Sequence, residues 1–123
     1  MDQASSFQKA MLTGDPDVMA AVLAPDVRFW SPAVHKPYEG REAVLTLLRA
    51  AHHVLEGLTY TETVESEGRT VLFFTAHVGD RDVEGIDALR FDDAGLVREL
   101  VVMIRPLSAL SAVAEAMGRR LAG

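Results

Sequence analysis

The stretch that decides the fold is EGIDALRFDDAGLV, residues 84–97. Its first half belongs to a strand-like run over residues 83–91, and Asp92-Asp93-Ala94-Gly95 then supplies the residue types that favour a turn. A second apolar and β-branched run follows at residues 96–105. The stretch therefore predicts a hairpin of two antiparallel strands.

The rest of the chain extends this hairpin into a sheet and covers it with helices. Two more strand-like runs precede it, at residues 58–65 and 70–78, with glycine-containing turns between them, which predicts an antiparallel meander of four strands. Elsewhere apolar residues recur at helical spacing, and one short aromatic run reads as a further strand. The predicted helices span residues 3–12, 16–23, 41–56 and 107–121, and the further strand spans residues 27–31.

Length and composition fit one domain, residues 1–123, with enough apolar material (49%) for one core. Twelve basic residues face 18 acidic ones, for a net charge of −6, and no segment gathers the basic residues into a stripe. This balance argues against nucleic acid and anionic membrane as partners. The absence of cysteine excludes disulfides, thiol nucleophiles and cysteine-based metal sites.

Targeting and cofactor signals are also missing from the sequence. The start MDQASSFQKA lacks the apolar core of a signal peptide, and the apolar runs are too short to span a membrane, so we expect a cytoplasmic protein. The histidines and acids never adopt a metal-ligand spacing, and no Gly-rich phosphate loop or nucleophile elbow occurs. We therefore expect neither a metal nor a cofactor.

Strand alternation aims one carboxylate into the predicted core. Asp87 shares a face with Leu89 and Phe91, whereas Glu84 and Arg90 lie on the other. Because burying an unpartnered ionised acid is costly, we expect Asp87 to be paired or held protonated with a raised pKa. Either state makes it a candidate acid, base or ligand donor. The alternative is a structural aspartate paired with an arginine or a backbone amide.

His77 is a second candidate, and its location depends on the hairpin register. It ends its strand on the face of Phe73 and Thr75. With Phe73 opposite Asp87 the histidine and the carboxylate share a cavity, whereas with Leu72 opposite they do not, and one residue of turn length decides. The first register predicts that Phe73 and Thr75 line the cavity.

Further side chains turn toward the same space. His35 and Tyr38 lie in a proline-stiffened loop, a typical place for a pocket mouth, and His52 lies at the edge of the buried stripe of its helix. The predicted catalytic residues are Asp87, His77 and His35. The predicted ligand-contacting residues are Phe7, Met11, Phe29, Ser31, Tyr38, Leu48, His52, Phe73, Thr75, Leu89, Leu100, Val102 and Ile104.

The last strand is apolar on both faces. Leu100, Val102 and Ile104 alternate with Val101 and Met103, although an antiparallel sheet usually leaves one face to water. We therefore expect a homodimer through the outer sheet face, where Val101 and Met103 would otherwise be exposed. The alternative is that the C-terminal helix folds over this face of a monomer.

The order of these segments resembles the NTF2-like superfamily. The segments that match are APDVRF (24–29), YEGREA (38–43) and residues 84–97, and the last is particularly similar to SnoaL-like proteins and ketosteroid isomerases. The resemblance implies an α+β cone, in which a curved antiparallel sheet packs on three N-terminal helices. Here the C-terminal helix is an addition, and the cone would enclose a pocket for an apolar small molecule.

The resemblance to ketosteroid isomerases also assigns roles to single residues. Their acid that matches Asp87 is held protonated and donates a hydrogen bond to the enolate. Their tyrosine donor on the first helix falls on Phe7, and their proton-shuttling aspartate falls on Ser31. A phenyl ring cannot donate, and a neutral hydroxyl cannot act as that base.

We therefore expect a protein that binds a polyketide-, steroid- or terpenoid-like carbonyl compound, with Asp87 as acid or base in an isomerisation or cyclisation. The alternative is a non-catalytic ligand-binding or dimerisation module of the same fold. The acid that matches Asp87 is present, which favours the enzyme. The isomerases' donor and base are replaced by Phe7 and Ser31, which favours the non-catalytic module. Whether the chain is an enzyme stays open on sequence alone.

Overall fold

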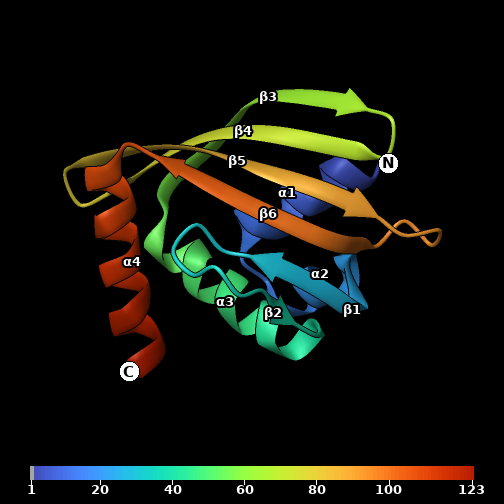
Figure 1. Cartoon of the computed structure of the whole chain (residues 1–123), viewed down its shortest axis with the longest axis horizontal. Coiled ribbons are helices and arrows are strands. Elements are labelled where there is room, and N and C mark those ends of the chain that lie inside the picture. The colour runs from blue at the N-terminus through green and yellow to red at the C-terminus, as the bar shows by residue number, and fades with distance from the viewer. Residues whose placement is uncertain (1) are drawn as a thin grey trace.

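Six strands form one curved sheet with helices on its concave side in the computed structural model, which describes residues 2–123 (Figure 1). The strand order is β2-β1-β6-β5-β4-β3. Neighbouring strands are antiparallel except β1 and β6, which are parallel, so the sheet is mixed at this pair. The helices are α1 (Gln3–Thr13), α2 (Pro16–Val22), α3 (Arg41–Val54) and α4 (Leu107–Ala122); the strands are β1 (Leu23–Trp30), β2 (Tyr38–Glu39), β3 (Glu56–Ser66), β4 (Arg69–Val78), β5 (Arg81–Phe91) and β6 (Val97–Arg105).

Capping side chains fix the starts of the first two helices. The Asp2 side chain accepts from the backbone N–H of Ser5, and the Asp15 side chain caps α2, with Pro16 in its first turn. Between them Gly14 adopts φ +71°, and a Cβ there would collide with the His52 ring of α3. A glycine is therefore required where α1 turns into α2 against α3.

The helices all pack on the inner, concave side of the sheet. In Figure 1, α1 and α2 lie behind the strands and α3 lies below them, and their core includes the fully buried Phe7, Val44 and Leu100. Helix α4 stands at the end of the sheet where β6 finishes, and its Val113 packs in a second cluster with Phe74 of β4. The alternative in which the C-terminal helix covers the outer face is therefore wrong.

The register between β4 and β5 differs from the one we expected. Leu72, and not Phe73, lies opposite Asp87, because a two-residue turn at Gly79 and Asp80 pairs the flanking residues directly. The alternate residues of β4 that we expected in the cavity therefore lie on the outer face. They are Phe73, Thr75 and His77, all of them exposed.

The register between β5 and β6 agrees with the prediction. Val102 lies opposite Asp87, so Leu100, Val102 and Ile104 face inward. Met103 faces outward and is 57% exposed, and Val101 lies on the same outer face. The two faces of β6 are thus assigned as the sequence indicates.

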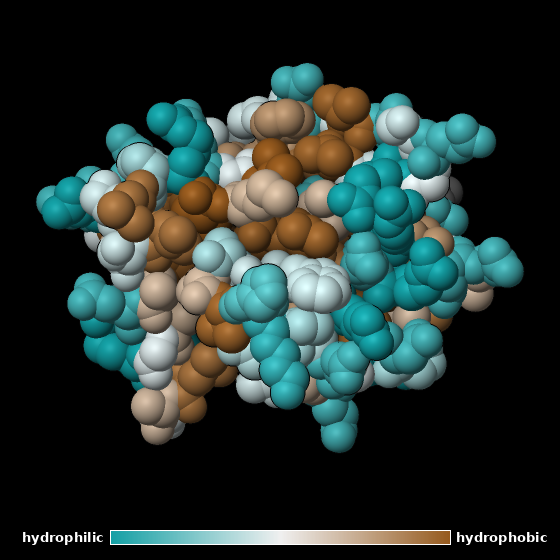
Figure 2. Space-filling view, in the orientation of Figure 1, coloured by the Kyte–Doolittle hydropathy of each residue, from teal (hydrophilic) through white to brown (hydrophobic). Residues whose placement is uncertain are grey.

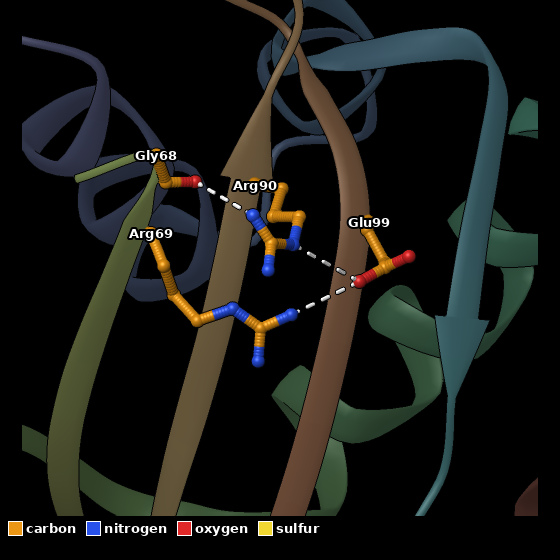
Figure 3. A network of polar contacts seen from close by, with 4 residues as sticks. All are labelled: Gly68, Arg69, Arg90 and Glu99. Carbon is orange, nitrogen blue, oxygen red and sulfur yellow. Dashed lines mark hydrogen bonds and ion pairs between the residues drawn. The ribbon is translucent and has the colours of Figure 1, made fainter. Parts of the chain in front are cut away.

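Charged side chains cross the outer face near the β5–β6 turn (Figure 3). Glu99 Oε1 lies 3.0 Å from a terminal nitrogen of Arg69 and 3.6 Å from Nε of Arg90. Arg90 also donates to the carbonyl oxygen of Gly68, at 3.4 Å. The network joins β4, β5 and β6, and because its members are partly exposed it adds little to stability.

Replacement of Gly85 by alanine tests the β4–β5–β6 packing. A Cβ at Gly85 would collide with the Phe74 ring and lie 2.7 Å from the carbonyl oxygen of Met103. We expect Gly85→Ala to lower the free energy of unfolding by about 1–3 kcal/mol, measured by urea denaturation. Gly118→Ala is the control, because nothing lies within 4 Å of its Cβ and alanine favours a helix. Equal stability of the two variants would contradict the close contact of Phe74 with β5.

Candidate functional site

A cavity of about 290 Å³ lies between the concave sheet and the helices. Its walls are almost entirely apolar, and its size suits a small organic molecule. Most of the residues that the sequence turns inward do line it. They are Phe7, Met11, Phe29, Ser31, Tyr38, Leu48, Asp87, Leu100, Val102 and Ile104.

Two further walls could not be derived from helix or strand periodicity. Helix α4 contributes Leu110, Val113 and Met117, so it closes one side of the cavity. The loop after β1 contributes residues 32–34. Both depend on where the C-terminal helix and a proline-rich loop lie in space, which local sequence patterns do not reveal.

Asp87 is the acidic residue of this cavity. It is 7% exposed, and burial raises its pKa from an ordinary 3.8 to about 7. Within residues 2–123 no arginine pairs with it: Arg90 contacts Glu99 on the outer face, and Arg105 pairs with Glu84 there. The predictions that Asp87 is buried, lies in the cavity and has a raised pKa are confirmed.

Tyr60 of β3 is the polar neighbour of Asp87, and sequence reasoning missed it. Its hydroxyl donates to Asp87 Oδ2 at 3.3 Å and partly offsets the effect of burial on the Asp87 pKa. Burial and the nearby carboxyl also raise the pKa of Tyr60, which keeps the phenol protonated. Alternation along 58–65 places Leu58 and Tyr60 on one face, so that alternation was the available signal.

The histidines do not join the cavity. His77 lies on the outer face, 3.2 Å from the carbonyl oxygen of Gly79, and His35 is exposed in the loop before β2. His52 points instead at the carbonyl oxygen of Met11, 2.7 Å from its Nδ1. The prediction that these three histidines reach the cavity is wrong. The β4–β5 register places His77 on the outer face, His35 lies exposed in its loop, and His52 is held by its contact with α1.

Leu89 also lies outside the cavity lining. It shares the inner face of β5 with Asp87 but is fully buried in the core formed with α1 and α3. It therefore supports the cavity floor and does not contact a ligand.

The two positions where ketosteroid isomerases carry further groups both line the cavity. Phe7 is buried and offers no donor. The Ser31 hydroxyl accepts from the backbone N–H groups of Ala33, at 3.3 Å, and Val34, at 3.0 Å. This hydroxyl is thus engaged in stabilising the loop, a typical role for serine in a turn.

Neither metal ligands nor membrane spans occur in the described chain. Within residues 2–123, no three His, Asp or Glu side chains are grouped so that they could hold a metal ion. Over the same range, no helix is long and apolar enough to cross a lipid bilayer.

Comparison with known proteins agrees with this geometry. A steroid delta-isomerase from Pseudomonas aeruginosa has 38% sequence identity and a TM-score of 0.92, with 98% of this chain and 89% of that chain covered. An uncharacterised protein with a cystatin-like fold from Silicibacter pomeroyi has 29% identity and a TM-score of 0.92, over 96% and 84% of the two chains. An NTF2-like protein of unknown function from Cytophaga hutchinsonii shares the fold, with 14% identity and a TM-score of 0.69 over 88% and 91%.

The fold and the lined cavity define an NTF2-like α+β protein with an internal pocket. The model of the SnoaL-like domain family matches residues 4–100, so the chain belongs to the SnoaL-like family. No curated protein sequence matches the chain.

The raised pKa of Asp87 predicts a pH-dependent stability. Between pH 3.8 and about 7 the folded protein holds a proton that the unfolded chain has released, so the free energy of unfolding falls as the pH rises. The slope is about 1.4 kcal/mol per pH unit, and the total is about 4 kcal/mol. Asp87→Asn removes this loss, and we expect that variant to be more stable than the wild type at pH 8 and to lose its advantage toward pH 4.

The measurement is urea denaturation of both proteins at several pH values. Asp92→Asn, in the exposed β5–β6 turn region, is not a neutral control because its carboxylate accepts backbone hydrogen bonds. Asp93→Asn is the better control, since Asp93 is exposed and its side chain makes no hydrogen bond within the part of the chain that the structure describes. If the wild type and Asp87→Asn changed in parallel with pH, Asp87 would not be the group that titrates.

Proposed function

We propose that this protein binds an apolar, carbonyl-bearing small molecule of polyketide, steroid or terpenoid type in the cavity, with Asp87 as the hydrogen-bond donor to the carbonyl oxygen. The observation that carries this proposal is a buried carboxyl group, 7% exposed and hydrogen-bonded to Tyr60, in a largely apolar pocket, where burial raises its pKa to about 7. The protonated carboxyl donates one hydrogen bond, and the apolar walls favour a hydrocarbon skeleton. The family match and the Pseudomonas isomerase support the same ligand class.

Acid or base catalysis by Asp87 is the enzymatic form of this proposal. A carboxyl whose pKa lies near neutral pH exists in both protonation states, which suits proton transfer in an isomerisation or cyclisation. In its ionised form Asp87 would take a proton from the carbon next to the carbonyl, and the same carboxyl would return that proton to another atom of the resulting enolate. This role needs only the one acid that the cavity contains.

A non-catalytic binding module is the second candidate, and a specific observation favours it. The Ser31 hydroxyl is committed to the backbone of its own loop, and Phe7 has no polar atom on its side chain. The cavity thus has a donor without an evident separate base. In this reading Asp87 only orients the ligand.

Ligand binding should depend on the protonation of Asp87. The probes are 2-acetylnaphthalene and 2-ethylnaphthalene, which are similar in shape but differ in the carbonyl oxygen. Because an ionised carboxylate cannot donate, we expect the Kd of the ketone to rise about tenfold between pH 5 and pH 9, as for the loss of one hydrogen bond. Fluorescence titration at each pH measures both ligands.

The hydrocarbon probe and Asp87→Asn serve as controls. The Kd of 2-ethylnaphthalene should not change with pH, and in Asp87→Asn the affinity for the ketone should be independent of pH. A pH-independent Kd for the ketone in the wild type would overturn the proposal. Faster exchange of the acetyl protons of the bound ketone into D₂O would favour the enzyme, and an unchanged exchange rate would favour the binding module.

We also propose that two copies pair through the outer sheet face. Cross-strand register lines up Phe73, Ile86 and Met103 in one apolar row, and Val101 lies in the next row. Figure 2 shows this apolar area on the sheet side, flanked by hydrophilic residues. A second copy is the fitting partner because the outer face carries both signs of charge on either side of the apolar rows, Arg69 with Glu99 on one side and Arg105 with Glu84 on the other, so a two-fold axis can bring Arg of one copy to Glu of the other.

A charge placed in the apolar row tests the pairing. We expect the wild type to have twice the mass of the 13.4 kDa chain in light scattering and Met103→Glu to be monomeric, because the glutamate would be buried against apolar side chains. Leu12→Glu is the matched control: Leu12 is 49% exposed on α1, away from the outer face. A monomeric wild type at micromolar concentration would refute the dimer.

A further inference from the structure

Two polar side chains meet in the cavity although they come from strands that are not neighbours. Tyr60 lies on β3 and Asp87 on β5, with β4 between them. The backbones of such strands are roughly 10 Å apart in a sheet. The sheet curves inward here, and the long tyrosine side chain crosses β4 to bring its hydroxyl 3.3 Å from Asp87 Oδ2.

The backbone and the packing around Tyr60 hold it in this position. Two irregularities of register flank it in β3, one between Glu56 and Thr59 and one between Tyr60 and Glu62. Its ring meets the Phe74 ring edge-on, with centroids 6.4 Å apart. Such bulges bend a strand and redirect its side chains, which suits a tyrosine that must reach across its neighbour.

The two carboxyl oxygens of Asp87 are in different situations. Oδ2 accepts from Tyr60, whereas Oδ1 has no recorded partner within residues 2–123. Two side-chain atoms in this range are fully buried and have no partner, Trp30 Nε1 and Arg69 Nε. Oδ1 of Asp87 is not one of them, so this oxygen is not fully buried. Since Asp87 lines the cavity, Oδ1 is the carboxyl oxygen that is open to a ligand.

We propose that Tyr60 is a positioning residue for Asp87. The Tyr60 hydroxyl donates to Oδ2 of Asp87, which leaves Oδ1 as the oxygen that faces a carbonyl ligand. In the neutral acid, the oxygen that accepts from Tyr60 is the carbonyl oxygen, and the proton is then on Oδ1. Oδ1 becomes the donor to the ligand. This inference rests on the proposed function for its ligand, but the hydrogen bond itself does not.

Among the described residues that line the cavity, no other titratable group competes with Tyr60 for Asp87. Of the cavity residues, α1, α3, α4 and β6 supply only apolar side chains and a glycine. The remaining titratable residue of the lining is Tyr38, which stacks on Phe29 with ring centroids 6.2 Å apart and makes no recorded hydrogen bond to Asp87. Removal of the Tyr60 hydroxyl should therefore change the pKa of Asp87 directly.

The test is Tyr60→Phe, read by ¹³C NMR titration of the Asp87 carboxyl carbon, which is assigned from its absence in Asp87→Asn. Loss of a hydrogen bond that favours the charged form should move the pKa of Asp87 upward from about 7, by roughly one pH unit. Tyr38→Phe is the matched control and should leave that pKa unchanged. A merely structural tyrosine would lower stability without moving the titration.

The ligand arm uses the two naphthalene probes at pH 5, where the carboxyl is protonated in every variant that carries it. We expect Tyr60→Phe to lose about 3- to 10-fold of the preference for 2-acetylnaphthalene over 2-ethylnaphthalene. An unchanged Asp87 pKa, or an unchanged preference in a folded Tyr60→Phe, would overturn the positioning role. If the pKa moves but the wild type shows no preference for the ketone, the proposed function fails and the hydrogen bond stands.

Discussion

A carboxyl group can lie inside the concave face of this sheet because one uncharged donor reaches it. Burial without any partner would favour only the neutral acid, whereas a paired arginine would keep it ionised. The effect of Tyr60 on the Asp87 pKa is intermediate between these two cases. Its uncharged hydroxyl stabilises the carboxylate in part, and the pKa of Asp87 is about 7. The curvature of β3 and the apolar helix layer are what make this arrangement available.

The same three strands serve two surfaces, because side chains alternate along them. On β5, Asp87 faces the cavity, while Ile86 and Ala88 belong to the outer face. Val102 and Met103 divide in the same way on β6. A partner on the outer face would therefore lie only one sheet thickness from the ligand, and it would restrain the cavity wall without touching its contents.

The four helices, five of the six strands and the β6 faces were predictable from sequence because they depend on local period and caps, whereas β2 (Tyr38–Glu39) lies in a segment that we expected to be a loop. Asp15-Pro16 starts α2, and alternation assigns Leu100 and Met103 to opposite faces. The β4 face depended on one residue of turn length, and the two-residue Gly79-Asp80 turn, a common hairpin length, was the signal to weigh. Tyr60 was harder, since its contact with Asp87 arises from sheet curvature and bulges that link residues 27 positions apart.

The departures from the ketosteroid isomerase pattern restrict what chemistry the cavity can perform. With phenylalanine at position 7 and the Ser31 hydroxyl held by backbone amides, the polar groups near the ligand are concentrated on one wall, at Asp87 and Tyr60. A proton shuttle between two carbons needs a base on the ring face of the substrate as well as a donor at its oxygen. This site supplies the donor, so the reactions open to it are those in which Asp87 itself takes and returns the proton, or in which the substrate provides its own base. Where neither holds, the role we propose for this geometry is to bind a carbonyl ligand without turnover, because the donor is held in place before a ligand binds.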